Sequence, residues 1–126
     1  MNQFNYKDIF KNNHLAISKA ISLIENNDKE LNNFYKHIYK RSNNALRIGI
    51  TGPPGAGKST IVDQLIECFI SKEKSIGVIA VDPSSPFSGG ALLGDRVRMG
   101  KYTDNDSVYI RSMGNRGDLG GLSKMT

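Results

Sequence analysis

The chain has 126 residues, a net charge of +5 and one cysteine. This length suits one small domain with a single core, and the longest uninterrupted apolar stretch, residues 78–81, is far too short to cross a bilayer. The amino terminus has no apolar signal region. Because the Lys and Arg residues are scattered rather than gathered into a basic stripe, the charge does not indicate nucleic-acid binding. We therefore expect a cytoplasmic protein that binds neither membranes nor nucleic acid.

Residues 1–44 are predicted to form a helical prefix. Apolar residues at helical spacing indicate one amphipathic helix, at Leu15, Ile17, Ile21 and Ile24. A second helix is predicted over residues 31–39, where apolar residues recur at i, i+3, i+4, i+7 and i+8. Both histidines, His14 and His37, lack metal-ligand spacing, and we expect them near the surface.

From residue 45 the pattern changes to alternating strands and helices. The predicted strands cover residues 45–51, 76–81 and 107–111, and the predicted helices cover residues 58–72 and about 95–102. This alternation predicts an α/β domain with a mostly parallel sheet covered by helices, over residues 45–126. On the first of these helices Cys68 shares an apolar stripe with Ile61, Leu65 and Phe69, so we expect a buried, unreactive thiol.

Residues 52–59 read Gly-Pro-Pro-Gly-Ala-Gly-Lys-Ser and form a complete G-x-x-x-x-G-K-[ST] loop. The loop lies between a predicted strand and a predicted helix, which is the context that this motif requires. Glycines let backbone amides turn toward phosphates, and the helix N-terminus adds partial positive charge. The motif predicts Lys58 at the β- and γ-phosphates and the Ser59 hydroxyl at Mg²⁺. The predicted nucleotide-binding residues are Gly52, Pro53, Pro54, Gly55, Ala56, Gly57, Lys58, Ser59 and Thr60.

Two carboxylates are candidate metal ligands, and each also has a purely structural explanation. Asp82 follows the predicted strand 76–81, and the carboxyl ends of parallel strands face the phosphate-loop edge of such a sheet. It could hold Mg²⁺ directly or through water, or it could simply begin a turn with the Pro and Ser residues that follow. Asp95 follows a glycine-rich run, and from its position alone a helix N-cap is the better explanation.

Four segments, in this order along the chain, resemble the MeaB/ArgK family of P-loop GTPases. The first surrounds the phosphate loop, at residues 49–60, and the second is Val-Asp-Pro-Ser-Ser-Pro at residues 81–86. The third runs from Gly89 to Arg96 and includes Met99, and the fourth covers residues 110–122. The resemblance extends over nearly all of the chain and is weakest in the helical prefix.

The resemblance implies a three-layer P-loop NTPase fold, GTP hydrolysis and, at full length, a homodimer. It implies a chaperone that protects or loads adenosylcobalamin-dependent methylmalonyl-CoA mutase. By position, Lys58, Asp82 and Asp95 would be the catalytic residues, and Ser59, Asp82 and Asp95 would surround Mg²⁺. Residues 84–94 would form a switch that responds to the γ-phosphate.

Two motifs that the resemblance leads us to expect are absent. No second acidic strand end of the Walker B type appears, and neither does an Asn-Lys-x-Asp guanine-reading motif, so GTP or GDP as the ligand rests on the resemblance. We expect the amino-terminal part of a larger GTPase, or the product of a truncated reading frame, with an incomplete sheet and little hydrolysis by itself. The alternatives are a P-loop kinase or ATPase of the lysine–arginine–ornithine transport-system type, and a catalytically silent binding module.

Overall fold

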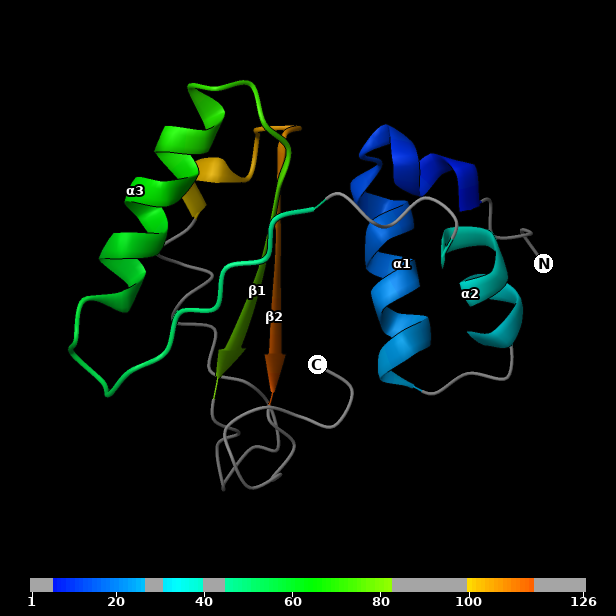
Figure 1. The fold of residues 1–126 in the computed structure, drawn as a ribbon, viewed down its shortest axis with the longest axis horizontal. Coiled ribbons are helices and arrows are strands. Elements are labelled where there is room, and N and C mark those ends of the chain that lie inside the picture. Colours follow the sequence, from blue (N-terminus) through cyan, green and yellow to red (C-terminus); the bar gives the residue numbers. More distant parts are fainter. Residues whose placement is uncertain (1–5, 27–30, 40–44, 83–99, 115–126) are drawn as a thin grey trace. The chain divides into compact units, whose positions relative to one another are not determined.

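The computed structural model describes residues 6–26, 31–39, 45–82 and 100–114 (Figure 1). Contacts between Cα atoms divide the chain into two compact units, Met1–Gly49 and Ile50–Thr126. Among the described residues, the helices are too short and too polar to cross a membrane. The proposed boundary between a prefix of residues 1–44 and a domain of residues 45–126 stays a prediction.

The first unit contains the 3₁₀ helix η1 (Tyr6–Lys11) and the α-helices α1 (His14–Glu25) and α2 (Leu31–Ile38). The side chain of Asn13 caps α1, where its Oδ1 accepts a hydrogen bond from the Ala16 amide at 2.9 Å. Both predicted helices are therefore confirmed. Their apolar faces meet in a small core of Ala20, Leu31 and Phe34, with Ile9, Leu23, Ile24 and Ile38 packed around it.

The described elements of the second unit are α3 (Lys58–Ile70), β1 (Ile76–Asp82), the 3₁₀ helix η3 (Gly100–Tyr102) and β2 (Val108–Gly114). The two strands pair in parallel, from Ile76 opposite Val108 to Asp82 opposite Gly114. α3 packs on this pair of strands around a buried cluster of Ile66, Tyr102 and Val108, joined by Val62, Ile70, Ile76, Val78 and Ile110. Helices beside parallel strands are a partial α/β fold, as the alternating pattern predicted.

The prediction of a strand at residues 45–51 is wrong within the described part of the chain. This segment belongs to no ladder, whereas β1 and β2 pair with each other. Leu46 and Ile48 of this segment are exposed, at 78% and 51%, and Ile50 is half-buried. A strand needs backbone partners and a buried face, and apolar composition supplies neither. Of the helix predicted at about 95–102, the described residues form only the short turn η3.

The prediction that Cys68 is buried is also wrong, because Cys68 is exposed. α3 is apolar on two faces, and the face that packs on the strands carries Val62, Ile66 and Ile70. Cys68 lies two residues from Ile66, about 200° around the helix. The stripe that suggested burial includes Ile61, which is 52% exposed. The two histidines are placed as expected, since His14 is half-buried and His37 is exposed.

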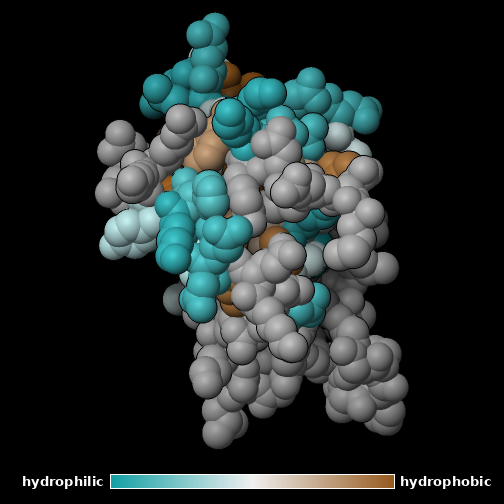
Figure 2. Space-filling model, turned by 90° about the vertical axis from the view of Figure 1, so that its right-hand side faces the viewer, coloured by the Kyte–Doolittle hydropathy of each residue, from teal (hydrophilic) through white to brown (hydrophobic). Residues whose placement is uncertain are grey.

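Exposed apolar side chains occur in both units. On the face shown in Figure 2 the coloured residues are mainly hydrophilic, and hydrophobic side chains reach the surface in separate small areas. The large exposed apolar residues are Phe10, Leu15, Tyr35, Tyr39, Leu46, Ile48, Ile61 and Ile79. Apolar residues scattered singly are normal on a protein surface, so these residues do not by themselves mark an interface.

Candidate phosphate-binding site

The phosphate loop turns directly into α3 at Gly57. This residue is the N-cap of the helix and has left-handed backbone angles, φ 83° and ψ 13°. Gly55 also has a positive φ, of 77°. Residues with a Cβ rarely adopt such angles, which explains why the loop carries glycine at these positions. The first turn of a helix has amides without acceptors in an earlier turn, so the start of α3 presents N–H groups and partial positive charge to a ligand.

The Lys58 side chain folds back over the loop. Its Nζ donates to the carbonyl oxygen of Pro53 at 2.9 Å, and the Ala56 amide donates to the same oxygen at 3.3 Å. A carbonyl is a neutral partner, unlike the carboxylates with which Lys11 and Lys101 pair. The Lys58 ammonium therefore brings positive charge to the loop, where a phosphate would need it.

Ser59 is the second residue of α3 and is half-buried, while Thr60 next to it is exposed. A serine hydroxyl is the hard oxygen donor that Mg²⁺ prefers, so the donor set at the start of α3 fits a nucleotide with its magnesium ion. Among the described residues, no three His, Cys, Asp or Glu side chains gather as a metal cluster. Mg²⁺ in proteins usually keeps several waters and is held by one or two protein ligands together with substrate phosphates.

Asp82 is the last residue of β1, where its backbone stands in register with Gly114 of β2. In Figure 1, α3 runs opposite to β1, so the loop before α3 lies at the end of the unit where both strands finish. This arrangement brings the backbone of Asp82 to the same end as the phosphate loop. Asp95, the predicted switch of residues 84–94 and residues 115–122 of the fourth resemblance segment lie outside the described residues.

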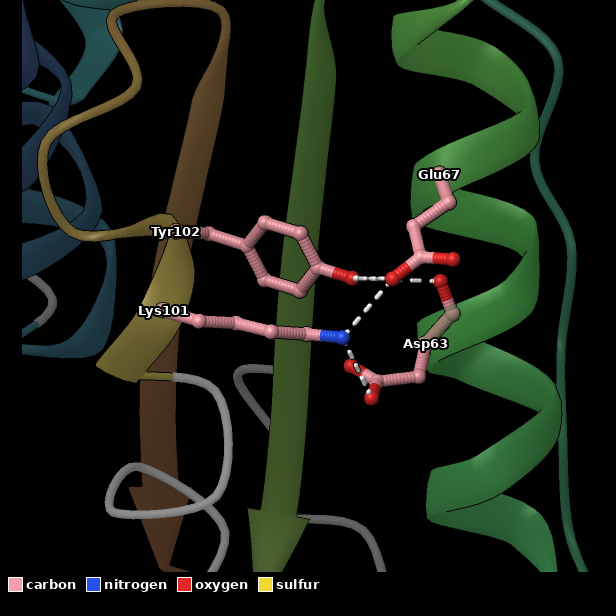
Figure 3. A network of polar contacts seen from close by, with 4 residues as sticks. All are labelled: Asp63, Glu67, Lys101 and Tyr102. Carbon is pink, nitrogen blue, oxygen red and sulfur yellow. Dashed lines mark hydrogen bonds and ion pairs between the residues drawn. The ribbon is translucent and has the colours of Figure 1, made fainter.

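A polar network holds η3 against α3 (Figure 3). Lys101 Nζ lies 2.9 Å from Asp63 Oδ2 and 2.8 Å from Glu67 Oε1. The Tyr102 hydroxyl donates to the Asp63 carbonyl oxygen at 3.3 Å and lies 3.4 Å from Glu67 Oε1. Hydrogen bonds to Glu67 and then Asp63 raise the pKa of Lys101, and burial raises the pKa of Tyr102.

Sequence reasoning missed this network entirely. The only local signal is the i, i+4 spacing of Asp63 and Glu67, which puts both carboxylates on one face of α3. Lys101 is 34 residues beyond Glu67, and no local pattern links the two. Only the packing of η3 on α3 brings them together.

A glycine-rich loop that opens a helix beside parallel strands is characteristic of nucleotide-binding α/β proteins. The family model described as "Methylmalonyl Co-A mutase-associated GTPase MeaB" matches residues 17–126 of the chain. The chain belongs to this family of GTPases, as the four sequence segments indicated.

Relatives from distant organisms carry the same family signal. A Pyrococcus horikoshii protein named "Putative GTPase PH0274" is 53% identical over 116 residues, which cover 92% of this chain and 37% of that protein. GTPase ArgK of Escherichia coli is 46% identical over 81 residues, or 64% of this chain and 24% of its own length. The methylmalonic aciduria type A homolog, mitochondrial, of Mus musculus is 32% identical over 141 residues, or 96% of this chain and 32% of its own. The chain thus spans about a third of the length of the curated relatives that it covers most fully.

Proposed function

We propose that this protein binds GTP and GDP together with Mg²⁺ and hydrolyses GTP. The observation that carries the proposal is the geometry at the start of α3, where Gly57 opens the helix in a left-handed conformation and Lys58 lies over the loop. Membership of a family of GTPases makes guanine the expected base. We propose the three-layer P-loop NTPase fold for the complete domain, with a helical prefix of residues 1–44.

In this proposal the residues of the loop bind and orient the triphosphate. Amides of residues 52–60 donate to the phosphate oxygens, and Lys58 leaves the Pro53 carbonyl to contact the β- and γ-phosphates. Ser59, Asp82 and Asp95 would hold Mg²⁺, which would supply positive charge to offset the negative charge of the phosphates. Water attacks the γ-phosphorus in line with that bond. Residues 84–94 act as the switch that responds to the γ-phosphate.

We propose that the partner is adenosylcobalamin-dependent methylmalonyl-CoA mutase, which the protein protects or loads in the cytoplasm as a homodimer. The description of the family model names an association with this mutase, and the mouse relative is named for methylmalonic aciduria. We expect a chain limited to residues 1–126 to hydrolyse GTP weakly or not at all, because its sequence has no second acidic strand end of the Walker B type after Asp82. Turnover by residues 1–126 equal to that of a complete family member would contradict this expectation.

Calorimetric titration of GTP into wild-type protein and Lys58→Ala tests the phosphate role. Each charge-assisted hydrogen bond contributes about 1.5–3 kcal/mol, so the loss of contacts to two phosphates should lower the affinity about 100-fold or more. Lys74→Ala is the matched control, because Lys74 follows the far end of α3 and its amide donates to the Phe69 carbonyl. Equal affinities of Lys58→Ala and wild type would refute the assignment of Lys58 to the phosphates.

A further inference from the structure

The helix that carries the phosphate loop also carries two carboxylates, Asp63 and Glu67, and one lysine from another part of the chain pairs with both. We propose that Lys101 sets the affinity of the loop for anionic phosphate, because it offsets part of the negative charge that these carboxylates place on α3. The proposal rests on the proposed nucleotide binding. With Lys101 the three side chains carry a formal charge of −1, and without it they carry −2.

Asp63, the nearer of the two carboxylates, is close enough to the loop to affect a bound phosphate. At a rise of about 1.5 Å per residue, Asp63 lies about 6 Å along the helix axis from Ser59, and Glu67 about 12 Å. Charges interact over about 10 Å at 0.1 M ionic strength. Unpaired negative charge at Asp63 would therefore oppose a bound phosphate and weaken the positive end of the helix.

Lys101 adds charge compensation more than it adds stability. Its side chain is 46% exposed and those of its partners are 32% and 54% exposed, and exposed ion pairs contribute little to stability. Tyr102, only 6% exposed, already fixes η3 on α3, because it packs in the core with Ile66 and donates to the Asp63 carbonyl. Loss of the Lys101 charge should therefore leave η3 in place on α3 and change the electric field at the N-terminus of α3.

The test compares Lys101→Met with Lys74→Met in the protein as its natural gene encodes it, by calorimetric titration of GDP. Both variants lose one positive charge, but Lys74 lies beside Phe69, roughly 15 Å along the helix from Ser59. At about 0.1 M ionic strength Lys101→Met should bind GDP about threefold more weakly than wild type, and Lys74→Met should bind it like wild type. At about 1 M ionic strength, where screening extends over only about 3 Å, the difference should disappear.

A second variant separates charge from structure. Asp63→Asn combined with Lys101→Met restores the formal charge of −1 without restoring the ion pair, so affinity should return to the wild-type value. Equal binding by Lys101→Met and Lys74→Met, a defect that persists at high salt, or a double variant that stays weak would each overturn the inference. Wild-type protein that binds neither GDP nor GTP would contradict the proposed function as well, whereas the other three results leave it intact.

Discussion

Replacement of Gly57 by alanine should damage the phosphate loop far more than it damages the fold. Gly57 has φ 83° and ψ 13°, and an L-residue in this left-handed conformation costs roughly 1–2 kcal/mol. A Cβ built at Gly57 meets no other heavy atom within 4 Å, so the cost is conformational and not steric. The loop can relieve it by rotating Gly57 out of the left-handed region, which turns the first amides of α3 away from the phosphates.

We therefore expect Gly57→Ala to lower the free energy of unfolding by about 1 kcal/mol or less, and GTP affinity by about tenfold or more, since 1.4 kcal/mol is a factor of ten. Urea denaturation and calorimetric titration measure the two quantities. Gly77→Ala in β1 is the control. Gly77 does not have a positive φ, and its Cβ position is open, so this substitution should change the free energy of unfolding and the GTP affinity by little. Unchanged GTP affinity in Gly57→Ala would refute the reasoning.

The remaining predictions concern the core, the metal and pH. Ile66 is 2% exposed, so Ile66→Ala should lower the free energy of unfolding by about 2–5 kcal/mol in urea denaturation. Cys68→Ala should lower it by less than about 0.5 kcal/mol. Similar losses in the two variants would contradict the conclusion that α3 buries Ile66 and exposes Cys68. Asp95→Ala should weaken the Mg²⁺ dependence of GTP binding, and an unaltered Mg²⁺ titration would leave Asp95 a capping residue. Because the pKa of Tyr102 is raised in the folded state, the contribution of its neutral hydroxyl to folding stability is complete below the unfolded pKa, about 10. This contribution is lost as the pH rises through the folded pKa. Tyr102→Phe should reduce the loss of stability above pH 10. If the variant and the wild type had identical pH profiles, the loss would not come from the ionisation of Tyr102.

The features that could be predicted from the sequence are those that neighbouring residues determine. The helices α1, α2 and α3 follow from local apolar periodicity, and the loop at residues 52–59 from a contiguous motif. β1 and β2 lie close to the predicted strands 76–81 and 107–111, because short apolar runs bounded by polar turns are typical of buried strands.

The features that could not be predicted depend on residues far apart in the chain. α3 has apolar residues on two faces, and only its packing on β1 and β2 decides that Ile66 is buried and Cys68 exposed. Residues 45–51 have the composition of a strand, but a strand also requires a paired neighbour. The contact of Lys101 with Glu67 joins two segments that share no local pattern.

Competition against labelled GTP on the protein as its natural gene encodes it tests the proposed nucleotide most directly. Unlabelled GTP and GDP should displace the label in the presence of Mg²⁺, and the same concentration of ATP should not. The binding should be lost in Lys58→Ala. Displacement by ATP as effective as displacement by GTP, or phosphate transferred from either nucleotide to a second substrate, would contradict a GTPase and favour a P-loop kinase.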